Sequence, residues 1–465
     1  MKTAQALIFL TCCSVCWYIK FNYCSIRRNR IRFMGGAMGL TAIEKHLARA
    51  SSAARVVPGD IVHPDPDLVI VHDGYIATAY RELSGLGIHR VFDPDRVMFV
   101  TDHDVIHATP LAAERARQNR LVAEKWGISR FYDVGQGGQG HVFPMEKGLV
   151  RPGMFLLCYD MHCTNFGAVG ALALRTGSEI ITVLAQGTIW VQVPHTIKVE
   201  LTGKMAPGVM ARDLGFRLAA DFVSGRHGAY DYRAIEFHGP GLHQLPVAER
   251  IALCNTLTEI GICATYFAPD EQTAKWYRDR GLAGGEIVTA DPDAGYESEL
   301  AVDLSALEPQ AVLPGGEKTI PLQAVELGRA VDHAYLGSCG SGTFDDLVVA
   351  ADILRGRTVA AGTRFLVTPG SNVTIARLER EGLGDVFRKA GAILLPAGCG
   401  PCAGGTMGPL GSGETSICTA AVNNFGRMGA KDAAIFLASP ATVAASAVAG
   451  AISDPRRFLE ERSAT

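Results

Sequence analysis

The chain of 465 residues is too long for one compact core and predicts two or three lobes. Hydrophobic residues make up 48% and charged residues 20%, a balance that fits a globular protein and excludes general disorder. The formal net charge of -3 gives no reason to expect nucleic acid or an anionic membrane as a partner.

Residues 1–37 form an unusual leader with the apolar run ALIFLTCCSVCWYI (6–19). This run is shorter than the roughly 20 residues of a membrane span, and no small-residue cleavage site follows it. One interpretation is a short hydrophobic anchor, and the arginines after it would keep the following domain in the cytoplasm. The favoured interpretation is a mis-assigned start, with the true beginning at Met34 or Met38, because MGLTAIEKHLARA then reads as a first helix. Both predict a cytoplasmic body without a stable membrane role.

Short apolar runs that end in polar residues predict buried strands in the first half of the chain. These runs are DLVIVHDG (67–74), RVMFVTDHD (96–104) and GMFLLCYDMH (153–162). The small-residue run FGAVGALALRTG (166–177) predicts a helix after the third strand. Strand ends of this kind are where α/β folds place their chemistry.

The middle of the chain predicts helices over 212–223 and 247–267. Turn-rich sequence follows, and it places a lobe boundary near 288, which divides the body into 38–288 and 289–465. The last lobe predicts alternating strands and helices, HAYLGSCGSG before FDDLVVAADILRG and TRFLVTPGS before NVTIARLERE. The overall prediction is an α/β fold.

The segment GQGGQG (135–140) matches a dinucleotide-binding pattern. Such a loop should open a helix, but His141 and Pro144 follow here and no βαβ unit is evident. Nicotinamide binding is therefore excluded.

Cysteines present the main chemical question. Four of the 12 lie in the leader, and the other eight are too scattered for a disulfide scaffold, which favours a reducing compartment. Cys399 and Cys402 are spaced as in a redox pair, half a zinc site or part of an iron–sulfur cluster. No good helix follows the pair, which disfavours redox cycling. Cys339 lies in a loop after a predicted strand, so three thiolates can meet at one sheet edge. Zinc would need a fourth ligand, Cys418 or a histidine, and stays an alternative.

Here a resemblance enters. YLGSCGSGTFDDL resembles the IGSCTNSRxEDL segment of the aconitase superfamily, and PAGCGPCAG resembles its PGCxxCxG segment. Further segments follow in family order over nearly all of 38–465, among them FVTDHDVIHATP, GQGHVFPMEKGLVRPGM, CYDMHCTNFGAVGALALRTGSE and NNFGRMG. The chain is most similar to the large subunits of isopropylmalate dehydratase and of homoaconitase-like relatives.

The resemblance implies an aconitase-like fold, three α/β domains around a central cluster cleft without the swivelling fourth domain. Domains 1 and 2 would occupy 38–288 and domain 3, with the cluster cysteines, 289–465. A separate small subunit would supply the swivelling domain, with the catalytic serine and a substrate-binding arginine.

The same resemblance implies a [4Fe-4S] cluster held by Cys339, Cys399 and Cys402. Three protein ligands leave one iron open as a Lewis acid toward a small carboxylic acid. The implied activity is that of a hydro-lyase, 3-isopropylmalate dehydratase-like, which dehydrates, hydrates or isomerises a 2-hydroxy di- or tricarboxylic acid, with leucine biosynthesis as a possible pathway.

Motif by motif, the resemblance also implies roles for individual residues. The implied catalytic set is Asp102, His103, His141, Asp160 and His162, with Glu236 as the partner of the last two. The implied substrate-binding residues are His72, Arg427 and Ser341.

The chain departs from the family pattern at several positions that we expect to face the substrate. Ser341 and Thr343 stand where the family has asparagine and arginine, Met161 replaces a serine, and Asn423 replaces an arginine. Loss of a guanidinium removes a charge-assisted bond to a carboxylate, about 1.5–3 kcal/mol. A different small diacid, such as maleate or a methylated malate, is therefore an alternative substrate.

A non-catalytic iron or redox sensor on the same scaffold is the rival from another functional class. A sensor needs only the cysteines, so the retained acid–base residues disfavour it.

Overall fold

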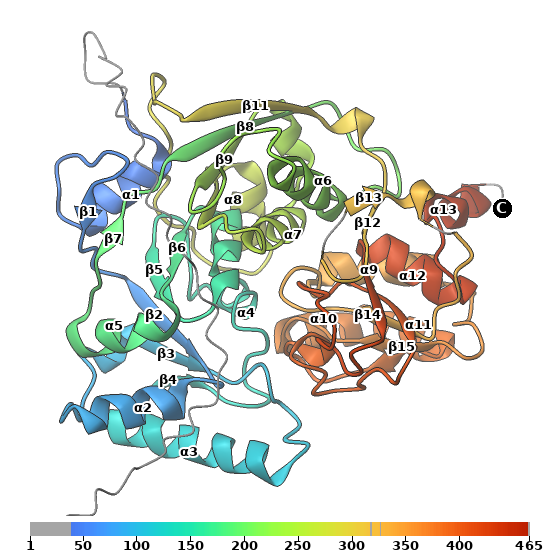
Figure 1. Cartoon of the computed structure of the whole chain (residues 1–465), viewed down its shortest axis with the longest axis horizontal. Helices are drawn as coiled ribbons and strands as arrows, with labels where there is room; N and C mark the ends of the chain where they lie inside the picture. The colour runs from blue at the N-terminus through green and yellow to red at the C-terminus, as the bar shows by residue number, and fades with distance from the viewer. Residues whose placement is uncertain (1–38, 317–318, 326, 464–465) are drawn as a thin grey trace, which may run out of the picture. The chain divides into compact units, whose positions relative to one another are not determined.

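Parallel β-sheet dominates the part of the chain that the computed structural model describes, residues 39–465 without 317–318, 326 and 464–465 (Figure 1). The predicted leader, whether anchor or mis-assigned start, lies outside these residues. Within them, no helix is both long and apolar enough to cross a bilayer.

The first sheet has five parallel strands in the order β4-β3-β2-β5-β6 (blue to teal in Figure 1). Its side chains alternate between two cores: Val69 and Val71 face one, while Ile70 faces the other. Helices therefore cover both faces, as parallel sheets require. The bounds are β2 Leu68–His72, β3 Val97–Val100, β4 Arg130–Tyr132, β5 Phe155–Cys158, β6 Leu172–Arg175, α1 Ala42–Ala50, α2 Ile76–Gly85, α3 Pro110–Trp126, α4 Phe143–Glu146 and α5 Ile180–Gln186.

A second parallel sheet has the order β10-β9-β8-β11. Its strands are β8 Thr196–Thr202, β9 Ala234–His238, β10 Ala264–Phe267 and β11 Ser298–Asp303, and its helices are α6 Ala211–Val223, α7 Val247–Thr258 and α8 Glu271–Arg278. Because β11 still belongs to this sheet, the sheets divide after Asp303, later than the boundary expected near 288. A small antiparallel pair, β1 (Ile61–Val62) and β7 (Val191–Gln192), lies outside the larger sheets.

The third sheet has seven strands in the order β13-β12-β18-β17-β14-β15-β16, and its last five are parallel. In Figure 1, α9 and α12 lie together against β14, in the orange and red part of the chain. The strands are β12 Gln310–Val312, β13 Thr319–Pro321, β14 His333–Leu336, β15 Arg364–Val367, β16 Ile393–Leu394, β17 Thr415–Cys418 and β18 Ala434–Leu437; the helices are α9 Phe344–Leu354, α10 Asn372–Arg380, α11 Leu383–Ala390, α12 Pro440–Ala449 and α13 Arg456–Ser463.

Most predicted elements are confirmed, including the strands after residues 67, 96 and 153 and the strand–helix pairs of the last lobe. The prediction of a helix over 166–177 is wrong. Residues Met161–Val169 form the 3-10 helix η2, and the chain then enters strand β6. The reason is a close approach: a Cβ on Gly167 would collide with the Thr265 carbonyl, so η2 packs directly on β10.

The predicted helix over 247–267 is also too long. Helix α7 ends at Thr258, Gly261 turns the chain with a φ of 101°, and strand β10 begins at Ala264. The apolar run ICATYF that continued the pattern is a buried strand, because short apolar runs fit either element equally well.

A buried histidine gives this fold a predicted acid sensitivity. His333 is fully buried at the start of β14, and burial lowers its pKa to about 3. A histidine in the unfolded chain has a pKa of about 6.5, so below that pH the unfolded state binds a proton that the buried ring does not. The contribution of the neutral ring to the free energy of unfolding is therefore complete above that pH and is lost as pH falls toward 3. We expect His333→Gln to flatten the fall in unfolding free energy between these values by about 1.4 kcal/mol per pH unit. Urea unfolding at a series of pH values measures it. His63→Gln, at an exposed ring, is the matched control, and equal slopes in both variants would contradict the assignment.

Candidate functional site

The carboxyl ends of β2 and β3 bring a carboxylate and two histidines together. The Asp102 carboxylate is fully buried and lies 3.0 Å from both His72 Nδ1 and His103 Nδ1. It also accepts a hydrogen bond of 2.7 Å from the Gly140 amide. His103 has a second carboxylate partner, Asp73, at 2.9 Å. The side chain of His103 is 34% exposed, so this end of the cluster faces solvent.

A second cluster forms where β5 runs into η2. Asp160 Oδ1 lies 2.9 Å from His162 Nδ1 and 3.7 Å from His141 Nε2. On its other side, His162 Nε2 lies 2.6 Å from Glu259 Oε1. The His72 and His141 rings, with centroids 4.5 Å apart, join the two clusters. Parallel strands that end at one edge produce this convergence.

Electrostatics divide these histidines into two kinds. Burial disfavours the charged ring of His103, but Asp102 and Asp73 outweigh burial and raise its pKa well above the ordinary value. Burial is likewise outweighed at His162, where Cys339 and the carboxylates of Asp160 and Glu259 raise the pKa well above its usual range. His141 is the opposite case, because burial and the neighbouring His72 hold its pKa well below normal. The site therefore sets charged histidines beside a neutral one.

The carboxylates respond in the opposite direction. Burial alone would raise the pKa of Asp102 and of Asp160, but the adjacent histidines hold both pKa values well below the ordinary range. Both groups are thus ionised partners of histidine at neutral pH.

Three thiols meet beside these clusters. Cys339 follows β14, while Cys399 and Cys402 follow β16, and all three side chains are buried. Burial raises the pKa of the Cys399 thiol well above normal, and the charges of Asp102, Cys339 and Cys402 raise it further. Ser338, just before Cys339, has a φ of 70°, a left-handed backbone that non-glycine residues rarely adopt outside constrained sites.

Each sulfur also has a hydrogen-bond donor. Asn255 Nδ2 donates to Cys339 Sγ at 3.0 Å, and the Ala421 amide donates to Cys402 Sγ at 3.5 Å. Gln139 Nε2 lies 3.7 Å from Cys399 Sγ and 3.1 Å from His141 Nδ1, so it joins the thiols to the histidines. Donors of this kind favour thiolate over thiol.

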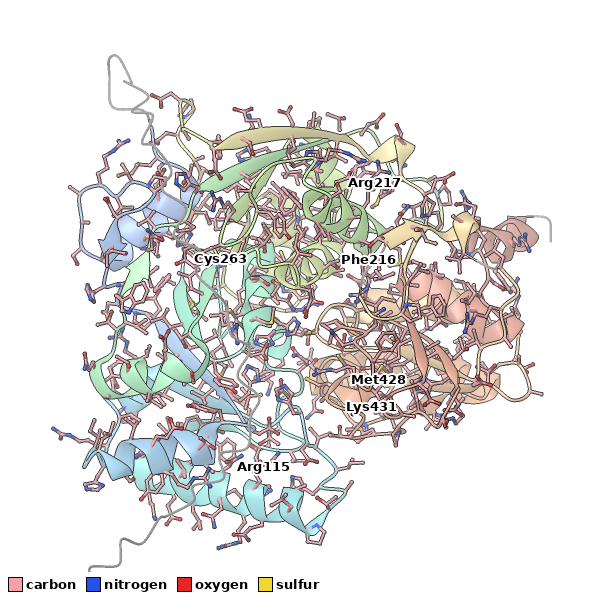
Figure 2. All side chains as sticks on the ribbon, in the orientation of Figure 1. Arg115, Phe216, Arg217, Cys263, Met428 and Lys431 are labelled. Carbon is pink, nitrogen blue, oxygen red and sulfur yellow. The ribbon has the colours of Figure 1, made fainter. Side chains whose placement is uncertain are left out.

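The residues fit a sulfur-ligated iron cluster. Thiolates on loops at one sheet edge are the required ligands. Several buried polar atoms nearby have no hydrogen-bond partner among the described residues, and such atoms usually await a ligand or water. They are His72 Nε2, His141 Nε2, Asn255 Oδ1 and Thr368 Oγ1. The Cys418 thiol contacts Met428 Sδ at 3.9 Å (Met428 is labelled in Figure 2).

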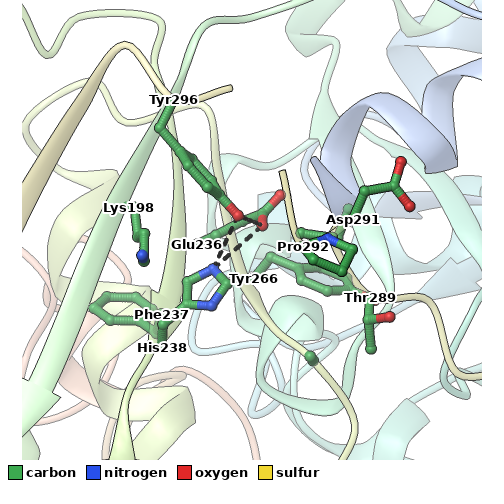
Figure 3. Close-up of a pocket in the computed structure, with 12 residues that line it drawn as sticks. Lys198, Glu236, Phe237, His238, Tyr266, Thr289, Asp291, Pro292 and Tyr296 are labelled. Atoms are coloured by element: carbon green, nitrogen blue, oxygen red, sulfur yellow. Dashed lines mark hydrogen bonds and ion pairs between the residues drawn. The ribbon is translucent and has the colours of Figure 1, made fainter. Parts of the chain in front are cut away.

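The expected partnership of Glu236 with Asp160 and His162 is wrong. Glu236 lies on β9 and accepts hydrogen bonds from the Ile43 amide and the Tyr296 hydroxyl, at 3.0 and 3.1 Å. It lines a separate pocket of about 330 Å³ together with His238 (Figure 3). A mid-strand glutamate cannot reach the strand-end cluster, and Glu259, just after α7, takes that position.

Sequence reasoning therefore missed Glu259 and Asn255. Both lie within the predicted helix 247–267, where polar residues among apolar ones looked like an ordinary helix face. One signal was present: residues four apart share a helix face, so an Asn and a Glu at that spacing in an otherwise apolar helix point the same way.

The other expected substrate contacts have local structural roles. The Ser341 hydroxyl donates to the Gly340 carbonyl and the side chain is fully buried. Thr343 caps α9, since its side chain accepts from the Asp346 amide. Asn423 Nδ2 donates to the carbonyls of Leu313 and Ile435, at 2.8 and 2.9 Å. These hydrogen bonds hold the three side chains in place, and Asn423 also lines the cavity that reaches Glu259.

Arg427 is partly buried, and its Nε has no hydrogen-bond partner among the described residues. No ion pair or hydrogen bond of the described chain joins it to the two histidine clusters or to the thiols.

One cavity reaches the cluster around His162, and a second reaches Met161, the residue before His162. One of about 640 Å³ reaches Glu259 and is walled by α6, where Phe216 and Arg217 are labelled in Figure 2. The other, of about 550 Å³, is lined by Met161 and by Cys263, also labelled there. Met161, expected to face the substrate, lines this second cavity, and Asp160, His162 and Glu259 do not line it.

The chain is similar to known proteins over most of its length. A model of the aconitase family (aconitate hydratase) matches residues 43–450. The large subunit 1 of 3-isopropylmalate dehydratase from Methanopyrus kandleri is 40% identical over 91% of this chain and 100% of its own length. A probable methanogen homoaconitase large subunit from Methanothermobacter thermautotrophicus is 36% identical over 89% of this chain and 97% of its own.

Among solved structures, aconitase X of Thermococcus kodakaraensis in its holo-form aligns with 83% of this chain and 90% of its own, with a TM-score of 0.48 and 12% identity. That likeness is too distant to carry a statement about this chain. The family model and the close relatives are sufficient: the chain belongs to the aconitase family, a family of hydro-lyases.

Proposed function

We propose that this chain is the large subunit of a [4Fe-4S]-dependent hydro-lyase that acts on a 2-hydroxy di- or tricarboxylic acid, in the manner of 3-isopropylmalate dehydratase. The observation that carries the proposal is the meeting of three buried thiols with two charged Asp–His clusters. A sensor or a structural metal site would need the thiols alone.

Cys339, Cys399 and Cys402 would hold the cluster, which when bound would supply a Lewis acid for the substrate hydroxyl. The protein residues then have separable tasks. His162 contacts a carboxylate through each ring nitrogen, Asp160 at Nδ1 and Glu259 at Nε2, so it would hold the proton that this group of three supplies to the departing hydroxyl. His103, charged and partly exposed, is placed to bind a substrate carboxylate.

A base for the carbon-bound proton is still required. His141 is the neutral histidine of the site, but its ring is only 1% exposed. We therefore propose that the base comes from a separate small subunit, as the resemblance implies, and that this subunit closes the cleft. The names of the relatives, which are large subunits, support such a partner.

We also propose a cytoplasmic location. The eight described cysteines are all free, as expected in a reducing compartment.

The function is tested by reconstituting the full chain anaerobically with iron and sulfide. We expect about four irons and four sulfides per chain, with a brown colour. Cys399→Ser should lose this cluster, because a ligand is removed, while Cys263→Ser, a thiol in a neighbouring cavity, should keep it. Iron and sulfide analysis measures both, and a chain that takes up only zinc would contradict the proposal.

The substrate class is tested on the reconstituted large and small subunits together. We expect turnover of 3-isopropylmalate or of a smaller diacid, maleate or a methylated malate. Because Thr343 and Asn423 fill structural roles, no arginine from those positions restricts the choice. Hydration and dehydration are followed by the absorbance of the double bond, and no turnover of any of these acids by a fully loaded complex would reject the assignment.

Glu259 and Glu236 provide a matched pair for the acid–base assignment. Glu259→Gln removes one of the carboxylates that keep His162 protonated, so we expect kcat to fall by about 10²–10⁴-fold. Since a lower pKa of His162 leaves it uncharged sooner as pH rises, the alkaline limb of the pH profile should move to lower pH. Glu236→Gln, in its own pocket, should leave that limb in place. An unmoved limb in Glu259→Gln, or equal shifts in both variants, would remove Glu259 from the proton path.

A further inference from the structure

A buried arginine lies beneath the thiol loops. Arg212, in the first turn of α6, is 1% exposed. Its Nη2 donates to the Ala420 carbonyl at 2.6 Å and its Nη1 to Ser341 Oγ at 3.4 Å, while Nε has no partner. The guanidinium also lies over the ring of Phe216, 5.1 Å from its centroid. The contacts of this cation are thus neutral groups.

No carboxylate of the described chain lies within ion-pair distance of Arg212, and its two acidic neighbours are engaged elsewhere. Asp346 accepts from Thr343 Oγ1 at 2.6 Å, and burial raises its pKa to about 8. Asp213 accepts from the amides of Met210 and Gln310, and burial raises its pKa to about 7. An unpaired charge in the interior is strongly unfavourable, so a compensating anion is expected close by.

The loops that carry Cys339 and Cys402 are where we expect this compensating negative charge. The charges of Cys339, Cys418, Asp346 and Cys402, in that order, oppose the effect of burial on the pKa of the guanidinium. Contact with the Cys339 loop is very close, because a Cβ on Gly340 would stand 2.5 Å from Arg212 Nη1. The family segment quoted above has threonine at this position, so the glycine makes room for the guanidinium against the loop.

We propose that Arg212 is the buried counter-charge of the sulfur-ligated centre, a positioning residue that acts through Cys339 and Cys402 without touching the substrate. This inference rests on the proposed function. Three thiolates around a cluster with a 2+ core carry a net negative charge, and one electron from dithionite makes the core 1+ and the centre more negative. A nearby fixed cation stabilises the reduced state more than the oxidised state, so Arg212 raises the reduction potential.

A purely structural role, as a tie between Ala420 and Ser341, predicts something different. Replacing the arginine would then lower the melting temperature and leave the potential of any loaded protein unchanged. The potential therefore separates the two roles.

The experiment uses the full chain, reconstituted anaerobically, with Arg212→Gln and Arg212→Lys. Dithionite titration followed by electron paramagnetic resonance measures the midpoint potential. We expect the midpoint potential of Arg212→Gln to be more negative than that of the parent protein by at least about 59 mV, a tenfold change in the reduction equilibrium of a one-electron couple. Arg212→Lys keeps the positive charge but has a shorter side chain without the guanidinium group. Its midpoint potential should therefore lie between those of Arg212→Gln and the parent protein.

Arg250→Gln is the matched control. Arg250 is equally buried on α7 but is paired with Asp270 at 2.5 Å, so its loss should lower stability and leave the potential unchanged. An unchanged potential in Arg212→Gln overturns the inference. If that variant does not fold, Arg212→Met, which also removes the charge, takes its place, and an unchanged potential there overturns the inference. Failure of the parent chain to take up iron and sulfide is a different result, because it rejects the proposed function itself.

Discussion

The site depends on the contacts that Asp102 makes with two histidines and with two loops. Asp102 is fully buried, it holds two histidines and the Gly140 amide, and its backbone carbonyl accepts from the Cys399 amide at 2.8 Å. A Cβ on Gly398 would stand 2.7 Å from that same carbonyl, so the cysteine loop can approach only without a side chain there. One residue thus sets the charge of the histidines and the position of a thiol that is almost 300 residues away in sequence.

Much of this arrangement could be predicted from sequence, because buried parallel strands have a recognisable pattern, a short apolar run followed by polar residues. His72, Asp102, Asp160 and Cys339 were all placed at strand ends by that pattern, and β2, β3, β5 and β14 end where expected. The prediction for Glu236 was wrong because it came from a motif match and not from a strand end. Glu236 lies in the middle of β9, too far from the strand ends to contact Asp160 and His162. A local sequence pattern predicts which secondary-structure element a residue belongs to, but only the tertiary fold shows which side chains lie next to it.

The two wrong element predictions have a common cause. Helix η2 and the end of α7 pack against each other and against β10. Gly167 permits the contact with β10, and Gly261, with its positive φ, turns the chain after α7. Apolar periodicity does not distinguish such a helix–strand junction from a longer helix. The residues that the junction exposes to the site, Glu259 above all, were therefore hidden within a helix that does not continue.

Helix α7 has a final turn with a role beyond packing. Asn255 contacts Cys339 Sγ, and Glu259, one turn later, contacts the ring of His162. The spacing between these two contacts is consequently fixed by the pitch of a helix, about 5.4 Å per turn. A rotation or slip of that one turn would shift both contacts at once, so helix α7 couples the surroundings of Cys339 mechanically to those of His162.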